Sequence, residues 1–356
     1  MLAPAGTEGF TSKLMDKKTD EKAAAPFVSP GAHWAGAFGE HISWPTGRVH
    51  PQDSHRWGVI LAGGDGKRLL PLTRRITGDD RPKQFCALSG GETLLTQTRR
   101  RVGQTVPGPQ TLLVMTQTHE RYFAEQVKGV PSSCLLIQPQ NHGTAPAIAY
   151  SLTRLQQIDP HGRVAFFPSD HHFANDEAFI THIDFAFSQA KSHPERVILL
   201  GIEPEAPEEA YGWIEPGSSL PGGSGDFISE VSRFWEKPSR RLAAHLMRRG
   251  CLWNSFVMVG AVDAFIKMIR HTLPNLLACF ESMWATTPPG REDEALRGLY
   301  LKVTATNFSD DVLSVRPSDL AVIRARGLGW SDLGEPQRVS SVLRLKNRIH
   351  CTELNT

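Results

Sequence analysis

The sequence is short of cysteine and has no long apolar run, and each shortage excludes a class of protein. Its five cysteines are odd in number, lie far apart and form no C-x-x-C pair. They are Cys86, Cys134, Cys251, Cys279 and Cys351. This pattern favours reduced thiols in a cytoplasmic protein over disulfides or a zinc site. No apolar stretch approaches the roughly 20 residues of a membrane span, and the N-terminus lacks the apolar core of a secretory signal.

The sequence also lacks an excess of charge of one sign. Lys and Arg number 39 against 37 Asp and Glu, which leaves a formal net charge of +2. A nucleic-acid surface is therefore not predicted. The 356 residues, 40% of them hydrophobic, suffice for one large domain or two ordinary ones. Basic residues gather between positions 67 and 83, which favours a small anionic ligand over a polymer.

Three segments are predicted along the chain. Residues 1–55 are rich in Ala, Gly, Pro, Lys and Asp without apolar periodicity, so we expect a mostly disordered extension. A targeting or partner-binding role for this extension stays open. Residues 56–334 carry the periodic elements and form the main domain, and residues 335–356 are predicted to be a helical tail.

Short apolar strands alternate with longer helical patterns as far as residue 201. The predicted strands are residues 58–62, 111–115, 134–137, 164–167 and 197–201, and the predicted helices are residues 92–102, 118–127, 144–157 and 177–192. This alternation predicts an α/β protein with a doubly wound, mostly parallel Rossmann-like sheet. Ligands bind such sheets beyond the carboxyl ends of the strands, here the loops after Ala62, Ile137 and Phe167.

The rhythm changes after residue 201, where turn-rich segments join the strands. The predicted strands are residues 211–217, 227–236, 253–259 and 320–325, and the predicted helices are residues 239–249, 262–271 and 291–302. We interpret these strands as a mixed or antiparallel extension of the sheet.

A glycine-rich loop follows the first strand and precedes the basic residues. Gly63, Gly64 and Gly66 allow a sharp turn that directs successive N–H groups to one point, as anion-binding nests do. The cations that follow are Lys67, Arg68, Arg74, Arg75, Arg81 and Lys83.

Two common phosphate-binding motifs do not fit this loop. The dinucleotide fingerprint needs a glycine at Leu69, and Pro71 interrupts the long helix that should follow. The P-loop pattern needs Ser or Thr at Arg68 to hold magnesium and a first glycine at Leu61.

The pattern that fits is GGxGxRLxPLT followed by PKQF, at residues 63–73 and 82–85. With these residues the chain resembles the sugar-1-phosphate nucleotidyltransferases, and within them the guanylyltransferases that act on mannose-1-phosphate. Six separated blocks match in family order over residues 57–338. Three departures stand out, Lys67 for Thr or Ser, Phe256 for Gly, and Glu335-Pro336-Gln337 after the WSDxG block.

The resemblance implies transfer of a nucleoside monophosphate from an NTP to a sugar-1-phosphate, with release of pyrophosphate. GTP and mannose-1-phosphate are the expected substrates, and GDP-mannose is the expected product. Neither a nucleic acid nor a membrane is expected as a partner. Two alternatives stay open. One is the same reaction with another pair, such as glucose-1-phosphate with dTTP or UTP, and the other is an inactive nucleotide-sugar-binding regulatory module. A homo-oligomer is compatible with the sequence.

The resemblance also implies a Mg²⁺ site on two carboxylates. Asp170 follows the strand at residues 164–167 in a PSDH block, and Asp332 lies in the WSDxG block. Two carboxylates suffice for Mg²⁺ when substrate phosphates and water complete its coordination. Asp170 alone would read equally well as a capping residue. His171 and His172 lack neighbours at zinc-ligand spacing and are interpreted as surface or supporting residues.

The remaining site residues are implied by the same matches. Arg68 and Lys83 would stabilise phosphate charge as catalytic residues, unless they are ordinary exposed cations. The expected nucleotide-binding residues are Leu61, Ala62, Gly63, Gly64, Gly66, Asn141, Gly143 and Thr144. The expected sugar-phosphate-binding residues are Gly212, Glu236, Lys237 and Asn254. A surface ion pair at Glu236 and Lys237 is the plainer alternative.

Overall fold

The computed structural model describes residues 55–88, 91–220 and 227–343. These residues belong to one compact unit of the chain. The predicted extension lies outside the described residues except for its last residue, His55. The end of the predicted tail, residues 344–356, also lies outside the described residues.

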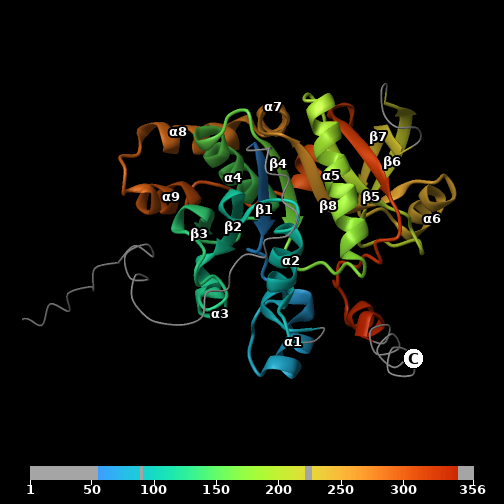
Figure 1. Ribbon diagram of the computed structural model, residues 1–356, viewed down its shortest axis with the longest axis horizontal. Helices are drawn as coiled ribbons and strands as arrows, with labels where there is room; N and C mark the ends of the chain where they lie inside the picture. Colours follow the sequence, from blue (N-terminus) through green and yellow to red (C-terminus); the bar gives the residue numbers. More distant parts are fainter. Residues whose placement is uncertain (1–54, 89–90, 221–226, 344–356) are drawn as a thin grey trace, which may run out of the picture. The chain divides into compact units, whose positions relative to one another are not determined.

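A mixed sheet of nine strands forms the centre of the described structure (Figure 1), in the order β3-β2-β1-β4-β8-β5-β9-β7-β6. The strands are β1 (Arg56–Leu61), β2 (Thr111–Thr116), β3 (Leu135–Gln138), β4 (Arg163–Pro168), β5 (Val197–Ile202), β6 (Gly212–Ser219), β7 (Ile228–Glu236), β8 (Leu252–Ala261) and β9 (Leu320–Ala325).

The first four strands of this order, β3, β2, β1 and β4, pair in parallel, as predicted. Strand β8 then enters between β4 and β5, antiparallel to both. Strands β6 and β7 form an antiparallel hairpin, and β6 also pairs with the start of β8. The predicted α/β sheet with a mixed extension is therefore confirmed.

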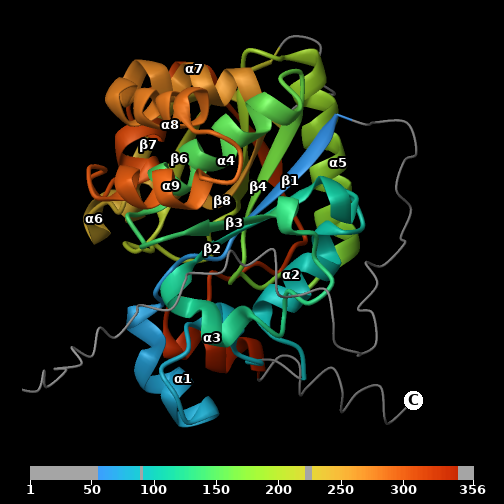
Figure 2. The ribbon, with the colours of Figure 1, turned by 90° about the vertical axis from the view of Figure 1, so that its left-hand side faces the viewer.

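Helices cover both faces of the sheet. They are α1 (Leu70–Thr77), α2 (Leu94–Val102), α3 (Glu120–Phe123), α4 (Thr144–Ile158), α5 (Asp176–Ser192), α6 (Arg240–Arg248), α7 (Val262–Thr272), α8 (Pro274–Thr286) and α9 (Glu292–Tyr300). Figure 2 shows α4, α7, α8 and α9 gathered on one face, with α2 and α5 on the other.

Successive side chains of the buried strands alternate between two hydrophobic cores. On β4, Val164 and Phe166 join one hydrophobic cluster, whereas Ala165 and Phe167 join the other. Side chains on a strand point alternately to opposite faces, so a continuous apolar run is what a sheet covered on both sides needs.

Two predicted features were wrong in detail, and one helix was not predicted. The helix predicted at residues 118–127 is only α3, preceded by a short 3-10 turn at Gln117–His119. Helix α1 follows the glycine loop although Pro71 was taken as an interruption, because Pro is compatible with the first turn of a helix. Helix α8, which begins with Pro274, was not predicted.

A third, smaller cluster joins the loops at one rim of the sheet. Leu69 from the glycine-loop segment and Cys86 pack with Leu333 and with Val339 and Val342 of a helix at residues 336–343. The predicted helical tail thus starts as a helix that packs against the domain. Apolar contact among these loops fixes their relative positions at the rim.

We expect the contact between α2 and α5 to depend on a buried ion pair. Arg101, 3% exposed, is 2.6 Å from Asp176 and lies over the rings of Phe173 and Phe179. Asp176→Ala would leave this guanidinium without its carboxylate and should lower the free energy of unfolding by about 2–3 kcal/mol. Urea unfolding of the wild type and the variant measures the change, provided that the two proteins have the same m-value.

The matched control is Asp263→Ala, which removes an exposed first-turn carboxylate paired with Lys267 at 2.6 Å. Exposed pairs of this kind contribute at most about 0.5 kcal/mol. Equal losses in the two variants would contradict a special role for the buried pair.

Candidate functional site

The glycine loop turns away from β1 at the carboxyl rim of the parallel strands. Gly66 has φ 60° and ψ 23°, the left-handed conformation that glycine adopts without strain. A Cβ there would also lie 3.3 Å from the main-chain nitrogen of Lys83. Two blocks that are separate in the sequence, the glycine loop and PKQF, are therefore in direct contact.

Side chains behind the loop hold its carbonyl groups. The Gln84 amide donates to the carbonyls of Ala62 and Gly64 at 3.1 and 2.7 Å, and the Thr116 hydroxyl donates to Gly63 at 2.9 Å. A peptide N–H points opposite to the carbonyl of the same peptide unit. The N–H groups of the next three residues, 63 to 65, therefore point away from Gln84 and Thr116. None of the three donates a hydrogen bond within the described residues. Such a row of free donors suits an anion.

Lys83 joins the strand-end carboxylate to the WSDLG segment. Its buried ammonium is 3.2 Å from Oδ2 of Asp170, and it donates to the main-chain oxygens of Asp332 at 2.5 Å and Leu333 at 3.3 Å. Main-chain hydrogen bonds between His172 and Ser331, at 2.8 and 3.0 Å, pair the same two segments. The two predicted metal ligands are thus brought together, and Lys83 is not an exposed loop cation.

The carboxylate of Asp332 accepts three hydrogen bonds on Oδ1. The donors are Arg338 at 2.7 Å, the Gly334 N–H at 2.9 Å and the Tyr211 hydroxyl at 3.0 Å. Burial raises the pKa of this carboxyl, but the Gly334 N–H and the charges of Arg338 and Lys83 bring it below its usual value. Asp332 is therefore held as an anion.

The donor set fits a magnesium ion by chemistry. Asp170 and Asp332 supply hard carboxylate oxygens, and phosphates and water complete the coordination of Mg²⁺ in many sites. Within the described residues no three His, Cys, Asp or Glu side chains form a complete metal cage. A divalent ion here would need ligands from its substrates.

The two histidines after Asp170 are enclosed, so of the two expected placements, at the surface or as supporting residues, the structure excludes the surface. The His172 residue is 6% exposed, and the His171 side chain is 13% exposed. The Trp330 indole donates to Nδ1 of His171 at 3.3 Å, which leaves the proton of the neutral ring on Nε2, 3.8 Å from Asp170. Burial lowers the pKa of His171 and favours this neutral form.

The four predicted sugar-phosphate residues lie together where β6, β7 and β8 meet. Gly212 pairs with Glu236, and a Cβ on Gly212 would be 2.9 Å from Oε2 of Glu236 and 3.3 Å from Cβ of Asn254. Lys237 binds Glu236 at 2.8 Å. The Glu236 side chain is 12% exposed and the Lys237 side chain 54%, so only the carboxylate of this ion pair is buried.

Phe256 adopts an unusual backbone conformation in a bulge between β5 and β8. Its φ is 60°, where a bulky side chain is strained, and its N–H donates to Oδ1 of Asn254 at 3.0 Å. The ring is partly buried against the same cluster as Leu61. The contact to Asn254 comes from the main chain of Phe256, so it does not depend on the departure from Gly noted in the sequence.

Tyr211 connects the sugar group with the carboxylate group. Its hydroxyl donates to Asp332, and its main-chain oxygen accepts from the Lys237 N–H at 3.2 Å. Its ring packs on Trp253 and Trp330 at centroid distances of 5.0 and 5.1 Å. Tyr211, Trp253 and Trp330 thus form one aromatic cluster, although their motifs are far apart in the sequence.

The predicted base-binding segment is partly covered by a later loop. Gly143 donates to Oδ1 of Asn141 at 3.0 Å, and Thr144 accepts from the Phe308 N–H at 2.9 Å. The Ala145 N–H donates to the carbonyl of Thr306 at 3.2 Å. The Ala145 N–H, in the first turn of α4, is therefore already bonded within the protein.

Arg68 is placed differently from Lys83. It is exposed on a short 3-10 turn, Lys67–Leu69, directly after the glycine loop. Its guanidinium makes no ion pair within the part of the chain that the structure describes. It is therefore free to bind an anion above the loop.

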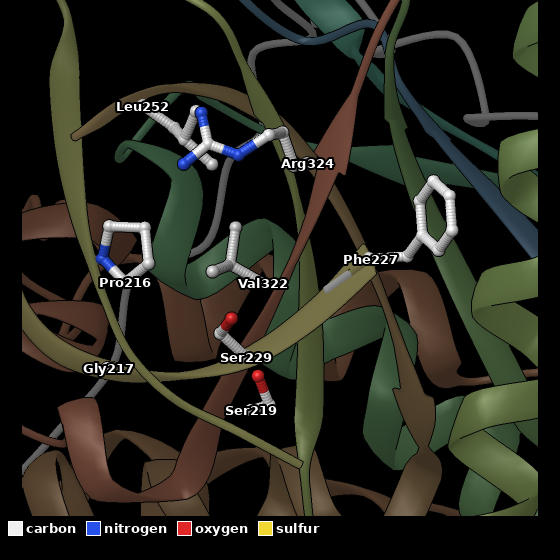
Figure 3. A pocket seen from close by; sticks show the side chains of 8 residues that line it. All are labelled: Pro216, Gly217, Ser219, Phe227, Ser229, Leu252, Val322 and Arg324. Atoms are coloured by element: carbon white, nitrogen blue, oxygen red, sulfur yellow. The ribbon is translucent and has the colours of Figure 1, made fainter. Parts of the chain in front are cut away.

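A separate pocket of about 260 Å³ lies among β6 to β9 (Figure 3). Its described lining includes none of the predicted site residues. Arg324, a charged residue of this lining, pairs with Glu203 at 3.4 Å. This pocket does not belong to the carboxylate site.

Comparison with known proteins identifies the family. A family profile described as nucleotidyl transferase matches residues 57–346, which is most of the chain. The chain belongs to the nucleotidyl transferase family. The resemblance predicted from the glycine loop and the PKQF block is thus confirmed.

Relatives of this family are similar over most of the chain. Mannose-1-phosphate guanylyltransferase ManC of Salmonella typhimurium is 29% identical over 282 residues, which cover 78% of this chain and 57% of ManC. Xanthan biosynthesis protein XanB of Xanthomonas campestris is 29% identical over 281 residues, with the same coverage. The chain thus spans 57% of the length of these relatives.

Solved structures share the fold. A crystal structure of mannose-1-phosphate geranyltransferase from Thermus thermophilus has a TM-score of 0.68 and 28% identity, covering 79% of this chain and 76% of that one. Mannose-6-phosphate isomerase from Helicobacter pylori, at 19% identity and a TM-score of 0.60, covers 78% of this chain and 99% of that one. The latter shows likeness of fold alone.

Several residues of the site were not predicted from the sequence. Tyr211 was named only as the first residue of a predicted strand, and Gln84 only as part of PKQF. Arg338 and Thr116 carried no signal at all. Each of them acts on a residue that lies far away along the chain or on a main-chain atom, and motif spacing does not show such contacts.

We expect the stability contribution of Glu236 to depend on pH. Burial raises the pKa of this carboxyl, an effect that Lys237 partly offsets. A raised pKa in the folded state stabilises the protein below the unfolded pKa, and this stabilisation is lost as the pH rises through the folded pKa. Glu236→Gln should therefore gain stability relative to the wild type between about pH 5 and pH 8.

Urea unfolding of both proteins at these two pH values measures this difference. Glu294→Gln, which alters an exposed carboxylate on α9, is the control. A gap between Glu236→Gln and wild type that narrows as the pH rises would contradict the expected sign.

Proposed function

We propose that this chain transfers a nucleoside monophosphate from an NTP to a sugar-1-phosphate and releases pyrophosphate. The carrying observation is the position of Lys83, which touches Asp170 and the WSDLG main chain while its own backbone contacts the glycine loop. GTP and mannose-1-phosphate are the proposed substrates because ManC, a relative over 78% of the chain, is a mannose-1-phosphate guanylyltransferase. We place the reaction in the cytoplasm.

The proposed reaction needs charge control more than a protein nucleophile. An oxygen of the sugar phosphate attacks the α-phosphorus, a new P–O bond forms, and the bond to the β-phosphate oxygen breaks. The attacking oxygen is already anionic, so no strong general base is required. Preorganised cations and N–H donors lower the barrier by stabilising charge that shifts toward the leaving group.

The glycine loop would hold the triphosphate from one side. Its free N–H groups face forward, and the exposed guanidinium of Arg68 lies at the end of the same loop. Arg68 would therefore neutralise charge on the departing β- and γ-phosphates. Lys83, which contacts Asp170, would balance the α-phosphate or the sugar phosphate once the ligand competes for its ammonium.

Asp170 and Asp332 would hold the divalent ion, proposed to be Mg²⁺. When bound, such an ion screens phosphate charge and aligns the attacking and leaving oxygens. In the chain itself, Arg338 and Tyr211 fix the direction of the Asp332 carboxylate. Trp330 fixes the ring of His171 beside Asp170.

The sugar would bind between Glu236, Asn254 and the main chain of Gly212. Glu236 accepts hydrogen bonds from sugar hydroxyl groups, and Lys237 reaches the phosphate of the sugar. Oδ1 of Asn254 is already used by the Phe256 N–H, so its amide NH₂ is the group left for a hydroxyl. The base would lie along Leu61 and residues 138–146.

A pyrophosphate-release screen tests the proposal. Purified protein is incubated with each NTP and with several sugar-1-phosphates in the presence of Mg²⁺. GTP with mannose-1-phosphate should give the highest kcat/KM. A preference for dTTP or UTP with glucose-1-phosphate would keep the reaction class and overturn the assignment of GDP-mannose. Tight GDP-mannose binding without any turnover would instead favour a regulatory binding module.

We predict that Asp332→Asn reduces kcat at least about 100-fold, the loss typical of removing one preorganised charge interaction. Asn retains a side-chain oxygen for Tyr211, and Arg338 keeps Glu208 as a partner at 2.7 Å. The melting temperature should therefore change little. Pyrophosphate release at saturating Mg²⁺ is the measurement.

The matched control is Asp319→Asn, which alters another Asp–Arg pair, with Arg316 at 2.8 Å. Neither Asp319 nor Arg316 is a predicted site residue, so Asp319→Asn should retain the kcat of the wild type. Near-normal turnover of Asp332→Asn would remove Asp332 from the proposed site.

A further inference from the structure

The glycine loop contains an acidic residue where an anion is expected to bind. Asp65 lies between Gly64 and Gly66, and its side chain is 34% exposed. A carboxylate beside a row of free N–H donors competes with a phosphate for these donors and repels it. Its orientation therefore decides whether the loop is open to a ligand.

His119 is the buried group that holds Asp65. It follows β2 on the Gln117–His119 turn, and its Nε2 is 3.4 Å from Oδ1 of Asp65. The His119 side chain is 10% exposed, whereas Lys67, the other partner of Asp65 at 3.6 Å, is 80% exposed. The contact to His119 is thus the one that fixes a direction.

The surroundings of His119 favour the neutral ring with its proton on Nε2. Nδ1 is buried and has no hydrogen-bond partner among the described residues, and the ring packs edge-on against Phe85 at 6.1 Å. Burial lowers the pKa of His119, although Asp65 opposes this. The remaining proton then points from Nε2 toward the carboxylate.

We propose that His119 is a positioning residue for the phosphates of the NTP and acts through Asp65. By drawing the carboxylate toward β2, it keeps the forward face of the loop clear. It also adds a further attachment to the loop, whose Ala62, Gly63 and Gly64 carbonyls are already tied to Gln84 and Thr116. The inference rests on the proposed function, in which this loop receives a triphosphate.

The test is a double-mutant cycle with inorganic triphosphate and Mg²⁺ as the probe, measured by calorimetry. His119→Leu should weaken binding about tenfold, the order of a hydrogen bond to a charged group. In an Asp65→Ala background the same change should have less than about a twofold effect, because its partner is gone. His119→Gln, which retains an N–H donor, should restore most of the affinity.

Kinetics provide a readout that a structural role would not give. His119→Leu should raise KM for the NTP and leave KM for the sugar-1-phosphate unchanged. His182→Leu is the matched control, because His182 on α5 makes its 2.7 Å contact to the Ala178 carbonyl of its own helix. It should change neither constant.

Three outcomes would overturn the proposal. They are an equal loss of affinity in His119→Leu with and without Asp65, a change confined to KM for the sugar-1-phosphate, and a wild-type protein that does not bind triphosphate. If His119→Leu does not fold, His119→Asn, whose amide is too short to reach Asp65, takes its place. A further outcome separates the two proposals. If His119 and Asp65 are coupled in triphosphate binding but the protein has no turnover, the proposed function is overturned and the role of His119 stands.

Discussion

The ammonium of Lys83 is the contact on which the rim of this structure depends. A buried cation is costly unless it is paired and hydrogen-bonded. Lys83 meets this requirement only because Asp170 and the main-chain oxygens of Asp332 and Leu333 converge on it. These groups come from distant parts of the domain sequence. The energy of satisfying one cation therefore holds the strand end, the WSDLG segment and the PKQF turn in one place.

The carboxylates of the site are balanced within the protein itself. Asp170 is paired with Lys83, and Asp332 with Arg338, whose guanidinium also lies 4.4 Å from the centre of the Tyr211 ring. Both carboxylates thus have a cationic partner in the structure without any ligand. Pairing of this kind keeps partly buried charges from being left uncompensated.

The sequence predicted the parts of the fold that depend on local pattern. The apolar runs of β1 and β2 and the long helices α4 and α5 were predicted to within two residues at each end, since burial on both faces leaves a clear signal. The antiparallel entry of β8 between β4 and β5 depends on distant pairing and was not foreseen. Likewise, the motifs identified Asp170 and Asp332, but not that Arg338 and Tyr211 hold the latter.

Backbone strain in the site is a property that the sequence motifs did not show. Lys237, Phe256 and Leu333 are the described non-glycine residues with positive φ, at 44°, 60° and 49°, and all three lie in site motifs. Such conformations cost on the order of 1–3 kcal/mol each and persist only where the surroundings fix them. Here the N–H of each is bound, to the Tyr211 carbonyl, the Asn254 side chain and the Ser331 hydroxyl respectively. The two large cores supply the stability that tolerates this strain, so the geometry of the site is a property of the whole domain.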